Sequence, residues 1–248
     1  MRIAEPPVSG IIFDFDGVMA DTIPKHEEFR SALAADFPGM NPGHAGKNAI
    51  TELRALGFSN EKIEEYLRGW QECEVAAKIK IFPGMNELLS ALNQKGVFCG
   101  ALTNRGPRPH NLRLFKDCGL ELQHLNFFVL HKEGVLPSLV RGHESCIYDK
   151  YSDKYYCLTP YCKPDPLAIM PVYRLLSRLP GFPESLYYAG DSKLDLKFTK
   201  NVGIRFIGTL SGNVNDPDEW LEAGLDELNG DIIVGNIAEI SQMDFRTG

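Results

Sequence analysis

The sequence has no long apolar run, and no stretch approaches the ~20 consecutive apolar residues that span a bilayer. Its opening residues, MRIAEPPVSG, lack the long apolar region of a secretory signal. It also has no internal repeat and no low-complexity tract. We therefore expect a cytoplasmic protein with no membrane partner.

An excess of positive charge is equally absent. The formal net charge of the 248 residues is -7, which disfavours a broad nucleic-acid-binding surface but allows a local basic pocket for a small anion. The six cysteines are scattered through a chain too large to need disulfide bonds, so we expect reduced thiols. Because 44% of the residues are hydrophobic and 24% are charged, the chain can bury a sizeable core.

Short runs of consecutive apolar, β-prone residues predict strands that are buried on both faces of a parallel sheet. These runs are residues 10–13, 97–102, 127–130, 186–189 and 203–207. Helical patterns, among them residues 86–94 and about 109–118, separate most of them. This alternation predicts an α/β fold, a Rossmann-like parallel sheet flanked by helices, with ligands bound beyond the carboxyl ends of the strands.

Two segments break the alternation. Between residues 18 and 82 there is no convincing buried strand, but residues 27–35, 49–56 and 61–77 have helical patterns, which predicts a small helical insert. Residues 130–163 are polar, rich in tyrosine and too long for an ordinary connection. We expect this second segment to be either a functional loop or a hairpin flap.

Two carboxylates, Asp14 and Asp16, follow the first predicted strand. Gly17 lets the backbone turn sharply, so both acids are expected to face the same opening. A carboxylate can attack phosphorus to form an aspartyl-phosphate, while a second acid protonates the leaving oxygen and later takes a proton from water. Taken alone, the pair could equally be a capping or turn pair.

Polar groups follow the later predicted strands. Thr103 and Asn104 offer a hydroxyl and an amide for phosphate oxygens, and Lys163 lies before a proline-fixed helix start, where it could neutralise a phosphoryl group. Asp191 and Asp195 add carboxylate oxygens that suit Mg²⁺. The alternatives are a helix cap for Thr103, a helix-start acid for Asp195 and a solvated surface side chain for Lys163.

These four pieces, in this order and each at a strand's carboxyl end, resemble the four motifs of the haloacid dehalogenase (HAD) superfamily. Residues 14–22 are similar to that family's opening signature in full, down to the acid at Asp21. The resemblance covers the whole predicted core. The acid at Asp16 implies phosphoryl chemistry, because the dehalogenase branch lacks an acid there and the phosphonatase branch carries alanine.

The resemblance also implies roles for the acids. Asp14 would be the nucleophile and a Mg²⁺ ligand, and Asp16 would be the general acid/base and a ligand through its backbone carbonyl. Asp191 would be the second metal carboxylate. Asp195 would sit just outside the ligand shell or reach the metal through water.

Thr103 and Lys163 would bind phosphate. The insert resembles the superfamily's helical cap of the C1 type, a layout shared by phosphoglycolate phosphatase and β-phosphoglucomutase. It would divide the chain into an α/β core of residues 1–18 and 83–248 and a cap of residues 19–82.

Three functional interpretations follow. The first is a Mg²⁺-dependent phosphatase that hydrolyses a small phosphorylated metabolite through phospho-Asp14, acting as a monomer or homodimer. The second is a phosphosugar mutase of the β-phosphoglucomutase type, which would shield phospho-Asp14 from water. The third is a catalytically idle HAD-fold domain that binds a partner through residues 130–163; the intact acids argue against it.

Substrate specificity should come from the cap, because the core binds only the phosphate that all substrates share. Asn104 and Arg105, beside Thr103, are the first candidates for substrate contact. Lys47 and Arg54, in the predicted cap, are further candidates, although a solvated helix N-terminus explains them at least as well.

Two other groups of residues have ordinary interpretations that we favour. The long segment contains potential zinc ligands at His143, Cys146, Cys157 and Cys162. Their spacing matches no standard zinc finger, so we take them as ordinary loop residues. The large aromatic residues of the insert, Phe37, Phe58 and Trp70, are expected to form the core of the cap.

Overall fold

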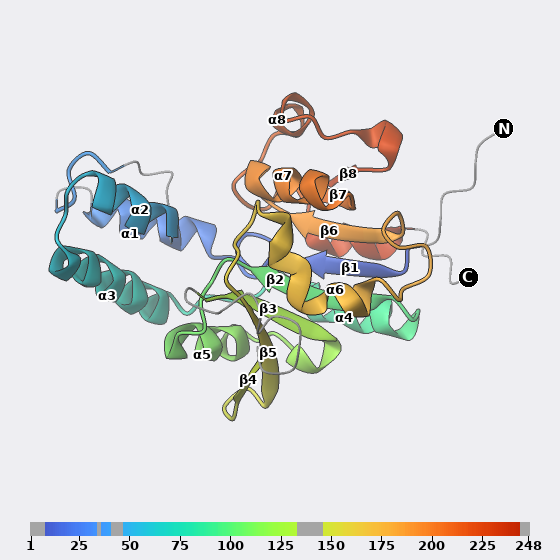
Figure 1. Cartoon of the computed structure of the whole chain (residues 1–248), viewed down its shortest axis with the longest axis horizontal. Helices are drawn as coiled ribbons and strands as arrows, with labels where there is room; N and C mark the ends of the chain where they lie inside the picture. Colours follow the sequence, from blue (N-terminus) through green and yellow to red (C-terminus); the bar gives the residue numbers. More distant parts are fainter. Residues whose placement is uncertain (1–7, 34–35, 41–46, 133–145, 244–248) are drawn as a thin grey trace.

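A single eight-stranded sheet forms the centre of the computed structural model, which describes residues 8–33, 36–40, 47–132 and 146–243. The strand order is β4-β5-β3-β2-β1-β6-β7-β8, and every neighbouring pair is parallel except β4 and β5 (Figure 1). The predicted α/β class, with a mostly parallel sheet flanked by helices, is confirmed.

The strands are short, as expected for a buried parallel sheet. They are β1 (Gly10–Phe13), β2 (Phe98–Thr103), β3 (Phe127–His131), β4 (Cys146–Asp149), β5 (Lys154–Thr159), β6 (Leu186–Gly190), β7 (Arg205–Thr209) and β8 (Ile232–Val234). The α-helices are α1 (Ile23–Leu33), α2 (Lys47–Ala55), α3 (Asn60–Ala77), α4 (Met85–Gln94), α5 (Pro109–Asp117), α6 (Met170–Leu176), α7 (Lys193–Val202) and α8 (Pro217–Glu222).

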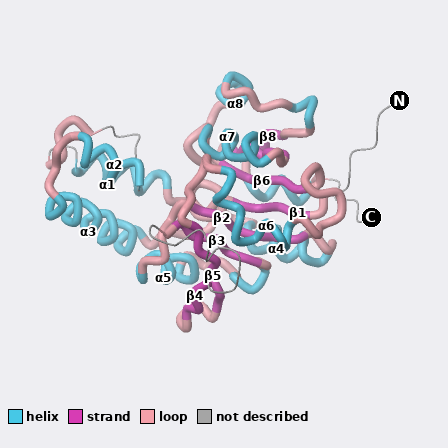
Figure 2. The backbone as a smooth tube through the Cα atoms, in the orientation of Figure 1, coloured by secondary structure: helices cyan, strands magenta, loops and turns pink. Residues whose placement is uncertain are grey.

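Helices pack on both faces of the sheet (Figure 2), which explains why the central strands are apolar at consecutive positions. In β1, Ile11 and Phe13 belong to the core shared with α4 and α5, whereas Ile12 belongs to the core shared with α6, α7 and α8. Successive side chains of a strand point to opposite faces, so both sets are buried.

Helices α1, α2 and α3 lie away from the sheet, on the left in Figure 1. They enclose a separate apolar core made of Phe29, Phe37, Leu53, Ile63 and Tyr66. Phe58 and Trp70 pack against this core. The three aromatic residues that we expected to form the core of the cap therefore do so.

The chain leaves and re-enters the α/β core at adjacent points. Ala20 forms an isolated antiparallel bridge with Ile81, and the amide of Asp21 donates to the Lys80 carbonyl at 2.9 Å. Two linkers that run side by side connect the helices to the sheet. The division into residues 1–18 and 83–248 on one side and 19–82 on the other stays a prediction.

One predicted strand begins later than expected, and one short edge strand was not predicted. The strand predicted at 203–207 begins at Arg205, because Gly203 adopts a left-handed conformation (φ 79°) that ends α7. Strand β8 was not predicted, since three residues are too few to show a period.

The tyrosine-rich segment contains a hairpin, β4–β5, that extends the sheet beyond β3. Tyr156 of β5 is fully buried, with its ring centroid 5.9 Å from that of Phe115 and 5.3 Å from that of Phe128. The described part of the tyrosine-rich segment therefore belongs to the sheet. Residues 133–145 of this segment, His143 among them, lie outside the described residues.

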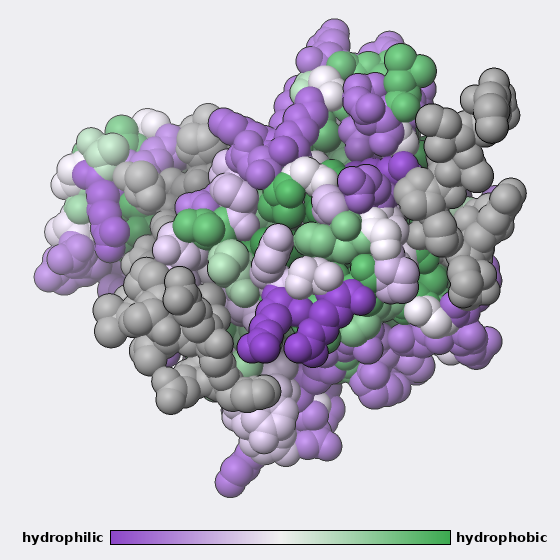
Figure 3. Space-filling model, turned by 45° about the vertical axis from the view of Figure 1, so that its right-hand side comes forward, coloured by the Kyte–Doolittle hydropathy of each residue, from purple (hydrophilic) through white to green (hydrophobic). Residues whose placement is uncertain are grey.

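Figure 3 shows one face of the molecule, on which hydrophobic side chains gather near the middle with hydrophilic ones around them. Among the described helices, none is both long enough and apolar enough to cross a membrane.

Candidate active site

The polar residues that follow the central strands meet at one edge of the sheet. Asp14 follows β1 directly, Thr103 is the last residue of β2, and Asp191 follows β6 directly. These three strands are neighbours and run parallel, so their carboxyl ends lie side by side. The strand-end rule applied to the sequence therefore located this edge correctly.

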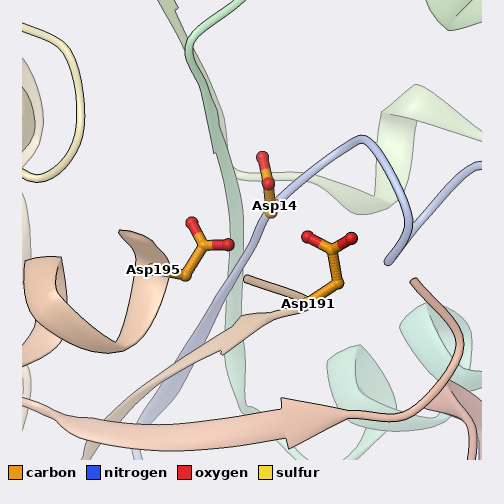
Figure 4. Close-up of side chains that lie close together, drawn as sticks. All are labelled: Asp14, Asp191 and Asp195. Atoms are coloured by element: carbon orange, nitrogen blue, oxygen red, sulfur yellow. The ribbon is translucent and has the colours of Figure 1, made fainter. Parts of the chain in front are cut away.

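Three carboxylates converge there. One oxygen each from Asp14, Asp191 and Asp195 lies within 4.8 Å of the other two, and all three residues are buried. Figure 4 shows the carboxyl groups turned toward one another, with Asp195 reaching in from the first turn of α7. Within the described ranges of the chain, no other three acids, histidines or cysteines bring their ligand atoms this close together, so Cys146, Cys157 and Cys162 do not form a metal-binding group there.

Lys163 supplies the positive charge of this cluster. Its Nζ lies 2.9 Å from Asp14 Oδ1, 2.6 Å from Asp195 Oδ1 and 2.7 Å from the Tyr188 hydroxyl. Burial lowers the pKa of Lys163, but the Asp14 and Asp195 carboxylates outweigh it and hold that pKa above its ordinary value. Lys163 is therefore a fixed ammonium in contact with the oxygen of Asp14.

One lysine does not balance three buried acids. Burial raises the pKa of Asp14 to about 7, although Lys163 opposes the shift. Burial, together with the charges of Asp195 and Asp14, raises the pKa of Asp191 well above its ordinary value. A second cation of oxygen-binding type would relieve this excess of negative charge, so the residues fit a Mg²⁺ ion held by Asp14 and Asp191.

Close backbone packing and an asparagine orient Asp191. The backbone amide and the Nδ2 amide of Asn213 both donate to Asp191 Oδ2, at 2.8 and 2.7 Å. A Cβ atom at Gly17 or Gly212 would collide with the Asp191 carboxyl group. Gly17 also has φ 71°, so glycine is required there for two reasons.

The sequence analysis did not identify Asn213 or Gly212. Both follow the carboxyl end of β7, next to β6, so the rule that located the other residues would also have pointed to them. Gly212 and Asn213 lie in a loop, where no apolar period marks them.

Both oxygens of Asp195 accept hydrogen bonds from the protein. Oδ1 accepts from Lys163, while Oδ2 accepts from the backbone amide and hydroxyl of Ser192, the residue that caps α7. Asp195 is therefore both an acid of the first turn of α7 and a member of the acid cluster.

Asn104 holds the backbone of Lys163. Its Oδ1 accepts from the Lys163 amide at 2.8 Å, and its Nδ2 donates to the Lys163 carbonyl at 3.3 Å. Thr103 is buried, and its hydroxyl accepts from the Arg105 amide at 3.2 Å. Direct contact of Asn104 with substrate stays a prediction. Its hydrogen bonds to the Lys163 backbone explain an amide at this position without any substrate.

Asp16 lies beside the acid cluster and forms a bidentate pair with Arg105. Nε and Nη2 of Arg105 lie 2.8 Å from Oδ2 and 2.7 Å from Oδ1 of Asp16. Burial raises the pKa of Asp16, but Arg105 outweighs it and lowers that pKa below its ordinary value. In this arrangement Asp16 is ionised. Arg105 pairs with Asp16, and its contact with substrate stays a prediction.

The two candidates from the cap lie on α2. Arg54 is exposed in the last turn of this helix. Lys47 is its first residue, and the Lys47 side chain is outside the described part of the chain. Their contact with substrate stays a prediction.

Residues 11–132, which include Asp14, Asp16 and Thr103, match the model of the haloacid dehalogenase-like hydrolase family. The chain belongs to this family. No curated protein matches the chain. The HAD-like fold extends beyond the matched residues, because solved HAD-like structures align with nearly the whole chain.

Three solved structures illustrate this similarity. A predicted phosphoglycolate phosphatase from Haemophilus somnus is 17% identical, with 94% of this chain and 96% of that chain covered and a TM-score of 0.64. A protein from Thermotoga maritima proposed to be a β-phosphoglucomutase is 24% identical, with 94% and 97% covered and a TM-score of 0.56. CbbY from Rhodobacter sphaeroides, solved in complex with phosphate, is 18% identical, with 94% and 96% covered and a TM-score of 0.59.

Proposed function

We propose that this HAD-family hydrolase is a Mg²⁺-dependent phosphatase that hydrolyses a small phosphorylated metabolite. The observation that carries the proposal is the contact of Asp14 with Lys163 at 2.9 Å, inside a buried cluster that includes Asp191. A carboxylate whose ionised form is favoured by a neighbouring ammonium can attack phosphorus. Mg²⁺, bound by Asp14, Asp191 and the backbone carbonyl of Asp16, would supply charge neutralisation for the transferring phosphoryl group.

The first step forms a bond between an Asp14 oxygen and phosphorus and breaks the bond from phosphorus to the leaving oxygen. Lys163 and Thr103 bind the phosphoryl oxygens, and Asp16 donates a proton to the leaving oxygen. Because Asp16 is paired with Arg105 and ionised in the structure, its carboxylate must first turn from Arg105 and take up a proton from solvent.

In the second step, water attacks phospho-Asp14 and Asp16 accepts a proton from that water. This step needs the ionised form of Asp16, which the pairing with Arg105 favours. Phosphate leaves and Asp14 is regenerated.

A screen of phosphorylated metabolites with Mg²⁺ present tests the proposal. Asp14→Asn and Asp16→Asn should each remove nearly all phosphate release, a loss of at least about 10²-fold for the acid/base, while the circular dichroism spectrum stays that of the wild type. Retained turnover in either variant would contradict the assigned role.

The similarity to a proposed β-phosphoglucomutase favours a phosphosugar mutase as the second candidate. The mutase would share the core residues described above. A hexose phosphate separates the two candidates, since a mutase forms an isomer and a phosphatase releases phosphate. A protein with neither activity on any compound would be the catalytically idle domain.

A further inference from the structure

Arg105 joins the α/β core to the helices of the insert. On one side its guanidinium pairs with both oxygens of Asp16. On the other side its Nη1 donates to Glu74 Oε2 at 3.0 Å and its Nη2 donates to Glu74 Oε1 at 2.6 Å. One guanidinium thus holds two carboxylates in bidentate fashion, an arrangement that fixes the plane of each.

Glu74 is unusual for an acid of an amphipathic helix, because only 4% of its surface is exposed. It lies near the end of α3 and faces cationic or hydrogen-bonding groups from three other parts of the chain. His26 of α1 contacts its Oε1 at 2.9 Å, and His110 of α5 lies 3.8 Å from its Oε2. Removing this charge would leave the buried Arg105 with one of its two carboxylate partners.

The contact requires α3 to be docked against the core. Arg105 lies in the loop after β2, and Asn111 of α5 also accepts a hydrogen bond from it at 2.9 Å. With Glu74 in place, the Arg105 guanidinium forms ion pairs with Asp16 on one side and Glu74 on the other. Its positive charge is therefore shared between two carboxylates. Without Glu74, the orientation of Asp16 would depend on Arg105 by itself.

We propose that Glu74 is a positioning residue that acts through Arg105 on Asp16 and so couples the docking of α3 to the orientation of the acid/base. The contact between Glu74 and Arg105 is given by the structure, whereas its effect on turnover rests on the proposed function. Glu74 itself does not touch the reacting atoms in this proposal. The coupling concerns proton donation to the leaving oxygen. Because Glu74 shares the charge of Arg105, it weakens the hold of Arg105 on Asp16 and lets the Asp16 carboxylate turn to take up the proton that it donates.

Leaving-group dependence separates positioning from a merely structural role. Phenol is a much weaker acid than p-nitrophenol, so phenyl phosphate needs proton donation to its leaving oxygen more than p-nitrophenyl phosphate does. We expect Glu74→Gln to lower kcat/KM for phenyl phosphate by at least about tenfold and to lower it less for p-nitrophenyl phosphate. Asp16→Asn should show the same order of sensitivity, and Glu74→Asp, which keeps the charge, should recover part of the loss.

Glu72→Gln is the matched control, because Glu72 is exposed on the same helix. Glu72→Gln should leave kcat/KM unchanged for both phenyl phosphate and p-nitrophenyl phosphate. An equal loss on both esters in Glu74→Gln, or no loss on either, would overturn the positioning role.

Hydrogen exchange measured by mass spectrometry keeps the contact testable without turnover. Glu74→Gln, but not Glu72→Gln, should speed exchange in the second half of α3 and in residues 105–111. If wild-type protein releases no phosphate from either ester while exchange changes as expected, the proposed function fails and the contact stands. Unchanged exchange in Glu74→Gln would refute the contact itself.

Discussion

Lys163 is the residue on which the charge balance of the core site depends. It contacts Asp14 and Asp195, and each of the three side chains is buried. Without the ammonium, two buried carboxylates would face each other with no cation from the protein between them. Such a site is costly because the desolvation of each charge is no longer compensated.

Lys163→Met should therefore lower the free energy of unfolding by about 3–5 kcal/mol. Urea unfolding in EDTA measures this change. Lys197→Met, at an exposed position of α7, is the control and should stay within about 0.5 kcal/mol of the wild type. Equal stability of the two variants would show that the ion pair contributes little.

Asp191 illustrates how a functional charge can oppose stability. Its pKa is raised by burial and by neighbouring acids, so its ionised form is destabilised without a bound cation. Asp191→Asn should raise the Tm in EDTA, because it removes one repelling charge. The same change should abolish stabilisation by Mg²⁺, because it removes a predicted ligand.

For the wild type, MgCl₂ at a hundred times its Kd should stabilise the fold by about 2.7 kcal/mol, a rise in Tm of roughly 5–10 °C. Differential scanning calorimetry with NaCl of matched ionic strength as the control measures both effects. A wild-type Tm that MgCl₂ leaves unchanged would contradict the metal site.

At the scale of elements, the β4–β5 hairpin shows why a pattern can locate a segment without defining its role. Residues 130–163 are predicted to be either a functional loop or a hairpin flap, since the pattern is polar and the connection is long. The structure places β5 between β3 and β4, where alternate side chains face the core. The sequence of β5, KYYCLT, has no run of consecutive aliphatic residues, so its pattern does not indicate a buried strand.

Two neighbouring tyrosines of β5 test this assignment. Tyr156 is fully buried and its hydroxyl donates to Ser152 at 3.0 Å, whereas Tyr155 is 67% exposed. Tyr156→Ala should lower the free energy of unfolding by about 3–5 kcal/mol. Tyr155→Ala should change it by less than about 0.5 kcal/mol. Similar urea midpoints for the two variants would mean that the hairpin contributes little to the fold.

The whole molecule has separate apolar cores, two on the faces of the sheet and one within α1, α2 and α3. The insert joins the sheet through two adjacent linkers, and contacts such as that between Glu74 and Arg105 cross the remaining boundary. A unit with its own core and few connections can open without unfolding the rest.

Phe37→Ala should therefore loosen the insert alone. Phe37 is buried in the insert, with ring contacts to Phe58 and Tyr66. Hydrogen exchange should become faster throughout α1 to α3 while exchange in β1, β2 and β6 stays at the wild-type rate. Faster exchange in the sheet as well would show that insert and core unfold as one unit.

The sequence by itself determined the α/β class and the edge at which the site lies. Consecutive apolar runs define buried parallel strands, and the carboxyl ends of such strands must meet, so Asp14, Thr103 and Asp191 could be grouped without coordinates. The HAD family was also identifiable from the motifs that follow these strands, and the match over residues 11–132 confirms it.

Only the tertiary structure decided which side chains pair. The contacts that hold the site join segments distant in the chain. They are those of Asn104 with the Lys163 backbone, of Asn213 with Asp191, and of Arg105 with both Asp16 and Glu74. No local period encodes them, because each depends on how helices and loops pack around the sheet and on the rotamers that this packing allows.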